Sequence, residues 1–327
     1  MKKFFKIAGI VVGSIAILLI AGLIYFNSVY PKAEPVPAIK VAASPERLAR
    51  GEYLVGHVAG CLDCHSERDW TKYGGPVKPG TLGMGGEVFD EETAGVPGAV
   101  YARNITPAGI GDWSDGELIR AITTGVSRDG SALFPIMPYG DLNYLRQEDL
   151  YSIVAYIRTL KPVENKIPAR HLDFPMNMMV KMIPFSSYNP GPPISQSDTV
   201  AYGEYLTTIA SCSGCHTQLD KGEPIKGMEF AGGMSFTLPA GVVKSGNITP
   251  DKQTGIGNWS KAQFIAFFKS FSSDSSRNIP VGENQYNTVM PITSFAGMTE
   301  GDLGAIYSYL MSLPPVHNQV VRFTARK

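Results

Sequence analysis

The sequence contains little cysteine, histidine or tryptophan, and it has no excess of one charge. Among its 327 residues are four cysteines, five histidines and three tryptophans. Lysine plus arginine and aspartate plus glutamate both total 29, so the formal net charge at pH 7 is zero. Because the net charge is zero, nothing in the composition favours nucleic acid or a strongly acidic partner. With 44% hydrophobic residues, the chain is long enough to bury two domain-sized cores.

The four cysteines all fall in two motifs, Cys61-Leu62-Asp63-Cys64-His65 and Cys212-Ser213-Gly214-Cys215-His216. A Cys-x-x-Cys pair alone could be a redox dithiol, half of a zinc site or a disulfide. None of these needs an adjacent histidine twice, and the two pairs lie a whole domain apart. A thioredoxin-like unit would also show more strand signals. The pattern is instead the attachment signature of c-type haem. We therefore predict two haem c groups, each held by two thioethers and a proximal histidine: Cys61, Cys64 and His65 for the first, and Cys212, Cys215 and His216 for the second.

The N-terminus combines positive charge with a long apolar run. Three lysines within Met1–Lys6 precede twenty residues, Ile7–Phe26, that include no charged side chain. Twenty helical residues can span a bilayer, and the lysines place the preceding end in the cytoplasm. Cleavage is the alternative, but 27–31 is a poor cleavage site, and no cysteine follows the run as a lipoprotein would require. We predict an uncleaved, single-pass signal anchor over 1–28 and an extended tether over 29–44. The remainder is then expected on the periplasmic side of a bacterial cytoplasmic membrane.

Longer phrases around the motifs recur in the same order, which indicates an internal repeat. Gly51-Glu52-Tyr53-Leu54 matches Gly203-Glu204-Tyr205-Leu206, and Asn104-Ile105-Thr106-Pro107 matches Asn247-Ile248-Thr249-Pro250. Gly109-Ile110-Gly111-Asp112-Trp113-Ser114 likewise matches Gly255-Ile256-Gly257-Asn258-Trp259-Ser260. We predict two haem domains, a first unit over 45–162 and a second unit over 198–327, joined by a structured linker over 163–197. The linker carries Met176, Met178, Met179 and Met182, and an apolar connector is favoured there over a methionine-rich metal site.

Apolar residues recur at helical spacing near the end of each unit. They are Leu150, Ile153, Val154, Ile157 and Leu160 before Pro162, and Leu303, Ile306, Tyr307 and Leu310 before Pro314-Pro315. Further helices are expected over 45–57, 114–124, 198–209 and 260–271, with Ser114 and Ser260 as N-caps. Because strand signals are few, the sequence predicts an all-α fold of two small helical domains after a transmembrane helix.

The repeat also indicates a second axial ligand for each haem iron. Met137 and Met290, each followed by proline, lie 72 and 74 residues after the histidines of their motifs. Such similar separations favour a shared duty over core filling, the usual role of a single methionine. We therefore predict that these two methionines are the sixth ligands. Other methionines and histidines lack a counterpart in the other unit, namely Met84, Met228, Met234, Met298, His57, His171 and His317. The paired Trp113 and Trp259 either donate to a haem propionate or simply pack.

The order of these motifs resembles a known family, the c-type cytochrome subunits of membrane-bound alcohol and gluconate-type dehydrogenases. The resemblance runs from about Pro45 to Val316, and the stretch 124–139 is especially typical. It implies a class I cytochrome c fold in each unit and an electron relay between a dehydrogenase and the respiratory chain, with a quinone or terminal oxidase as acceptor. Family members often carry three haem domains, whereas this chain has two and an N-terminal anchor.

Three functional hypotheses follow. The leading one is a membrane-anchored dihaem cytochrome c with both irons ligated by histidine and methionine, which transfers electrons and is not itself an enzyme. A dihaem peroxidase is the alternative, but it needs one iron that opens to peroxide, and the paired methionines argue against it. A gas or redox sensor ranks last.

Overall fold

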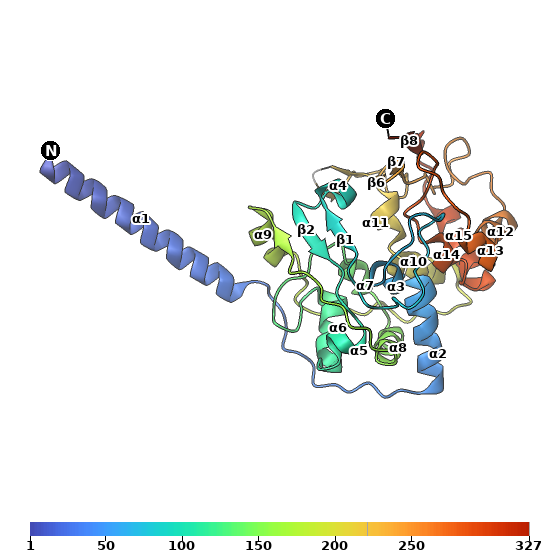
Figure 1. Cartoon of the computed structure of the whole chain (residues 1–327), viewed down its shortest axis with the longest axis horizontal. Coiled ribbons are helices and arrows are strands. Elements are labelled where there is room, and N and C mark those ends of the chain that lie inside the picture. The colour runs from blue at the N-terminus through green and yellow to red at the C-terminus, as the bar shows by residue number, and fades with distance from the viewer. Residues whose placement is uncertain (221, 327) are drawn as a thin grey trace.

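A long N-terminal helix, α1 (Lys2–Val29), projects away from the rest of the chain in Figure 1. The computed structural model describes residues 1–220 and 222–326. Within them, α1 is the one helix long and apolar enough to cross a membrane, and none of its residues is buried. A membrane anchor and a signal sequence share these properties. An extended segment leads from α1 to the body that holds both haem motifs.

Most helices of the body have a counterpart in the other unit. The first unit contains α2 (Pro45–Tyr53), a π-turn η1 (Leu54–Val58), α3 (Cys61–Cys64), α4 (Glu91–Ala94), α5 (Pro107–Ile110), α6 (Asp115–Thr124), α7 (Tyr139–Leu142) and α8 (Gln147–Ile157). The linker contains α9 (Met176–Met179) and a 3-10 turn η2 (Val180–Met182). The second unit contains α10 (Thr199–Ile209), α11 (Cys212–His216), α12 (Lys261–Lys269), α13 (Asp274–Arg277), α14 (Ile292–Phe295) and α15 (Glu300–Ser312).

The prediction of an all-α fold was wrong, because the structure is 41% helical with 10% strand in three small sheets. One antiparallel sheet pairs β1 (Val88–Asp90), β2 (Gly98–Tyr101) and β3 (His171–Leu172). Another pairs β6 (Ser235–Leu238), β7 (Gly241–Lys244) and β8 (Phe323–Ala325), and a small hairpin joins β4 (Leu219–Asp220) to β5 (Glu223–Pro224). Strands of two to four residues are too short to show a period of two, so the sequence pattern did not indicate them.

The two three-stranded sheets extend the repeat beyond the helices. In each, a hairpin receives its third strand from the chain after the terminal helix of the unit, β3 after α8 and β8 after α15. The structure thus joins the beginning of the linker to the sheet of the first unit.

In each unit, the helix before the haem motif crosses the terminal helix at a glycine. A side chain at Gly51 on α2 would collide with the carbonyl of Ser152 on α8, and one at Gly203 on α10 would collide with that of Ala305 on α15. The recurring glycine therefore permits close backbone approach. One continuous cluster of buried apolar side chains, including Leu54, Ile153, Leu206 and Leu303, runs through both units.

The predicted N-caps of α6 and α12 are confirmed. The hydroxyl of Ser114 accepts from the amide of Glu117, whose side chain accepts from the Ser114 amide, and Ser260 and Gln263 form the same capping box. Such a cap stabilises a helix by about 1 kcal/mol. The terminal helices predicted before Pro162 and Pro314 are present as α8 and α15.

Two tyrosines bind the units to one another. The Tyr53 hydroxyl of the first unit donates to Asp302 of the second over 2.5 Å, and the Tyr205 hydroxyl of the second donates to Asp149 of the first over 2.5 Å. Asp149 is 5% exposed and also accepts from Arg50 at 2.8 Å and from Arg146 at 3.1 Å. Its carboxylate is thus a buried, fully partnered charge at the boundary between the units.

Candidate haem-binding sites

Both haem motifs begin after a residue with left-handed backbone. Gly60 has φ of 60° before α3, and Ser211 has φ of 52° before α11. The left-handed region is uncommon for a residue other than glycine. Ser211 adopts this conformation at the place equivalent to Gly60. The two motifs therefore share the turn but not the residue type.

Each motif histidine is oriented by a backbone carbonyl. The Nδ1 of His65 lies 2.6 Å from the carbonyl oxygen of Arg103, and the Nδ1 of His216 lies 2.7 Å from that of Gly246. A carbonyl only accepts, so Nδ1–H donates and Nε2 keeps its lone pair, as for a metal-ligating histidine. Burial lowers the pKa of both imidazoles, which favours the neutral form that ligates iron.

The phrase Asn-Ile-Thr-Pro holds these carbonyls in place. In the first unit, the side chain of Asn104 accepts from the amide and hydroxyl of Thr106 and donates to the carbonyl of Val163 over 2.8 Å. In the second, Asn247 does the same with Thr249 and Val316. The phrase therefore ties the loop to the chain after the terminal helix. Sequence reasoning missed the two carbonyls, although the recurrence of the phrase directly after them was the available signal.

The four motif cysteines are free thiols, of which Cys61 and Cys212 are half-buried. Cys64 and Cys215 keep exposed surface, yet burial among the surrounding protein atoms raises the pKa of Cys64 to about 12 and that of Cys215 to about 11. Burial likewise raises the pKa of Cys61 and of Cys212 to about 12. Two thiols and a carbonyl-oriented neutral imidazole on one short turn are the donor set of haem c, so these residues fit that group.

The two candidate sixth ligands occupy the same local turn. Met137 lies two residues before α7 and Met290 two residues before α14, and both are half-buried against the core. Two residues after each methionine, the backbone amide donates to the methionine carbonyl, at 2.8 Å for Tyr139 and at 2.7 Å for Ile292. The similar spacing in the sequence thus corresponds to a similar backbone turn.

The segment that carries Met290 is docked on the first unit. Asn287, which is 3% exposed, accepts from the amide of Gly74 over 2.8 Å and donates to the carbonyls of Trp70 and Lys72. The Arg68 guanidinium approaches the carbonyl of Val289 at 3.4 Å. The methionine segment of one unit is therefore fixed by the loop that follows the haem motif of the other.

Contacts on the far side of Met290 also come from the first unit. The Ser294 hydroxyl donates to Asp63 over 2.9 Å, and the Nδ1–H of His57 donates to the Ser294 carbonyl over 3.0 Å. Asp63 is 5% exposed and belongs to the first haem motif. Burial raises the pKa of Cys64, and the carboxylate of Asp63 adds to this effect. The first haem motif therefore lies against the segment that carries Met290, at the boundary of the units.

The segment that carries Met137 is held by the linker instead. Asn143 is 4% exposed, donates to the carbonyls of Thr123 and Ser187, and accepts from the amide of Asn189. The rings of Tyr139 and Phe185 meet edge to face at 6.3 Å. The two methionine segments share a turn but have different surroundings.

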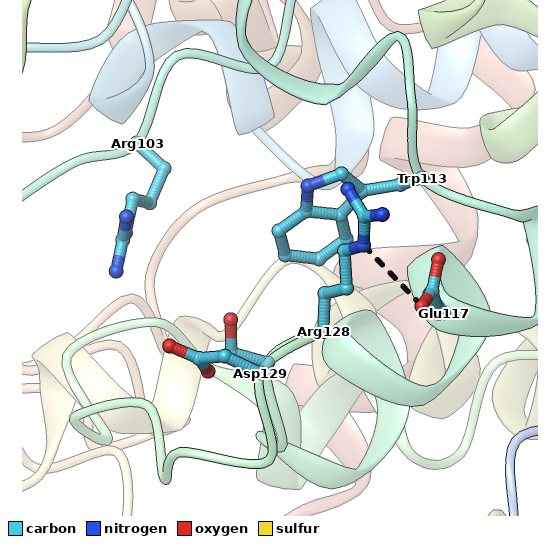
Figure 2. A pocket seen from close by; sticks show the side chains of 6 residues that line it. Arg103, Trp113, Glu117, Arg128 and Asp129 are labelled. Atoms are coloured by element: carbon cyan, nitrogen blue, oxygen red, sulfur yellow. Dashed lines mark ion pairs between the residues drawn. The ribbon is translucent and has the colours of Figure 1, made fainter.

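The paired tryptophans line equivalent surface pockets. Figure 2 shows the first, of about 340 Å³, in which Arg128 extends beside Trp113 and forms an ion pair with Glu117 at 3.5 Å. The second, of about 430 Å³, is lined by Asn258, Trp259, Gln263 and Phe267. Trp259 packs edge-on against Phe267 at 5.6 Å.

The remaining histidines lie apart from the motif turns. His171 and His317 are 77% and 62% exposed and lie beside Asp173 and Asp251. Within 1–220 and 222–326, no cluster of three or more histidine, cysteine, aspartate or glutamate side chains could hold a metal ion.

Several curated proteins are similar to the chain. It is 30% identical, over 82% of its length, to the cytochrome c subunit of a quinone alcohol dehydrogenase from Gluconacetobacter polyoxogenes, of which it matches 56%. It is 29% identical, over 91% of its length, to the fructose dehydrogenase cytochrome subunit of Gluconobacter japonicus, of which it matches 58%. A dihaem c-type cytochrome of Cereibacter sphaeroides is 27% identical over 82% of the chain and is matched over 86% of its own length.

The similarity covers most of this chain but only part of most relatives. The chain spans a little over half the length of the dehydrogenase cytochrome subunits named above. No protein-family model matches it. The resemblance predicted from the motifs is confirmed by these relatives.

Proposed function

We propose that this chain, whose homologues are cytochrome c subunits of alcohol, fructose and gluconate dehydrogenases, is a membrane-anchored dihaem electron carrier. The homologues support an electron-transfer cytochrome rather than a catalytic subunit. The observation that carries the proposal is the pair of motif histidines, each with Nδ1 held by a carbonyl at 2.6 or 2.7 Å. Two sites built alike favour one repeated duty.

In this proposal the first haem c is attached to Cys61 and Cys64 and the second to Cys212 and Cys215. His65 with Met137 and His216 with Met290 are the axial pairs. Each haem, when bound, supplies an iron that gains or loses one electron, and a methionine ligand favours its ferrous form. The chain holds the imidazoles neutral and oriented, and a sulfur on the opposite side of each iron would leave no position open for a substrate.

The proposed electron donor is a dehydrogenase, because the relatives are named as subunits of such enzymes. A quinone or a terminal oxidase is the proposed acceptor. We further propose that α1 stays attached and anchors the chain in a bacterial cytoplasmic membrane, with both units on the periplasmic side. Twenty apolar residues after three lysines support this orientation.

A pyridine haemochrome assay should find two covalently bound haems per chain. Replacing both Cys61 and Cys64 with alanine should leave one, and so should replacing Cys212 and Cys215, because each pair supplies the thioethers of one haem. Mass spectrometry of the intact variants would measure the same loss. One haem in the unaltered chain would contradict the assignment of the repeat.

Asn287→Ala and Asn143→Ala form a matched pair of tests for the methionine segments. Each buried side chain leaves backbone partners unsatisfied when removed, at a cost of about 1–3 kcal/mol. Asn287→Ala should weaken the sulfur-to-ferric-iron absorption of the second haem, because this residue holds the Met290 segment on the first unit. Asn143→Ala should weaken only that of the first haem. Equal effects of either variant on both haems would refute the separate anchoring.

A further inference from the structure

The linker carries a group of exposed apolar side chains that the electron-transfer proposal does not use. We call them the linker patch: Phe174, Met179, Met182, Ile183 and Phe185, with exposures of 79%, 46%, 52%, 41% and 44%. They stand within twelve residues of one another in the sequence. Single exposed apolar residues are ordinary on soluble proteins, but a contiguous group of this kind marks an interaction surface.

The segment that bears the patch is firmly seated on the first unit. Val180, between α9 and the rest of η2, is 1% exposed and shares a small buried cluster with Val96, Ala132 and Leu172. Leu172 is also part of β3, which pairs with β2. One side of the segment is therefore packed inward, while the patch faces outward.

The patch lies where the chain leaves α1. The Lys181 ammonium, within η2, donates to the side chain of Asn27 near the end of α1. Beyond α1, the amide of Glu34 donates to the carbonyl of Ser186 over 2.8 Å. Figure 1 shows α9, in yellow-green, on the side of the body that faces the end of α1. The contact between η2 and α1 thus fixes the position of the linker patch along the axis of α1.

At this position along α1, the linker patch would lie at the surface of a bilayer. The 28 residues of α1 measure roughly 42 Å at 1.5 Å per residue, whereas a hydrocarbon core is about 30 Å thick. If α1 spans the membrane, its C-terminal turns lie at the level of the lipid headgroups. Amphipathic segments at this level bury apolar side chains about 5–10 Å deep, and a lysine among them reaches toward the phosphates. Lys181 occupies this position within the patch.

We infer that the linker patch rests in the outer lipid surface of the bilayer that α1 enters. This inference depends on the membrane anchor in the proposed function, and it names the lipid interface as the occupant of the patch. It also orients the molecule, because the patch is seated on the first unit.

Photolabelling from the lipid tests this contact on the full-length haem protein. The chain is placed in nanodiscs of phosphatidylethanolamine and phosphatidylglycerol that contain a phospholipid with a diazirine on its acyl chain. After illumination, peptides bearing lipid adducts are mapped by mass spectrometry. Adducts are expected in α1 and in 174–185, but not around Val321, which is 69% exposed on the second unit.

The outcomes separate this inference from the anchor on which it depends. Adducts in α1 without any in 174–185 would overturn the lipid contact and leave the anchor standing, and a protein partner would then be the better occupant. No adducts in either segment would overturn both. Changing Met182 and Ile183 to serine should lower labelling of 174–185 severalfold while α1 labelling is unchanged. Val321→Ser is the matched control and should alter neither, so equal losses in both variants would also count against the inference.

Discussion

Replacing Met290 with alanine is expected to abolish the sulfur-to-ferric-iron absorption of one haem, and replacing Met137 that of the other. The reason is that each iron, on our proposal, takes its sixth ligand from the unit that carries its histidine. Axial ligands are among the features that spread haem potentials over about 0.8 V, and methionine raises the potential. A fall in the potential of the affected haem should therefore accompany the loss. Optical spectra and redox titration of each purified variant would measure both effects.

Methionines without a counterpart in the other unit provide the controls. Met84 and Met228 are half-buried like the candidate ligands, one in each unit. Met84→Ala and Met228→Ala should therefore keep both absorption bands. Unchanged spectra in Met137→Ala or Met290→Ala would show that the ligand is another residue. Peroxide turnover in the unaltered protein, with both bands intact, would instead favour the peroxidase hypothesis.

Replacing Asp149 with leucine is expected to destabilise the fold by about 3–5 kcal/mol. This carboxylate accepts from Arg50, Arg146 and Tyr205, and its side chain is 7% exposed. Removing one partner of a buried charged group leaves the others unpaired in a medium of low dielectric constant. Denaturant unfolding of the haem-loaded protein would measure the loss. Asp112→Leu is the surface control, because Asp112 is 72% exposed in its pair with Arg128, and little change is expected there.

The contribution of Asp149 to the free energy of unfolding should depend on pH in a defined direction. Burial acts to raise the pKa of Asp149, but the hydrogen bonds and charge of Arg50, with Tyr205 and Arg146, outweigh it and lower the pKa below its ordinary value. The stabilisation is therefore complete above the unfolded pKa of about 3.9 and is lost as the pH falls through the lower folded value. The stability difference between the unaltered chain and Asp149→Leu should accordingly be constant near neutrality and shrink below about pH 4. A difference that grows in acid would contradict the ion-pair assignment.

Local features of the fold could be predicted from the sequence, whereas pairings between distant segments could not. The caps at Ser114 and Ser260 and the terminal helices α8 and α15 depend on residues within a few positions of one another. The sheets depend on strands of two to four residues, and β3 reaches β2 from about seventy positions along the chain. Such pairs leave no periodic pattern, which is why an all-α fold was predicted.

The candidate sites show the same division. The haem motifs and the repeated methionines are readable as short phrases, and they remain predictions about ligation. The carbonyls of Arg103 and Gly246 carry no side-chain signal, although the phrase that follows each recurs. The docking of Asn287 on Gly74 joins residues 213 positions apart, and nothing in either segment alone indicates the other. The repeat in the sequence indicated the candidate haem ligands of each unit, but not the contacts by which one unit holds the other.

The crossed tyrosine contacts carry a consequence for the origin of the chain. Tyr53 and Tyr205 are equivalent residues of the repeat, as are Asp149 and Asp302, and each tyrosine binds the aspartate of the opposite unit. This exchange is the contact pattern of a two-fold symmetric dimer, in which one surface meets a copy of itself. A single ancestral unit with this tyrosine and aspartate could have paired as a homodimer before duplication fused the two copies. The differences now seen at Asn287 and Asn143 are what fusion allows, since each copy can then diverge without altering its twin.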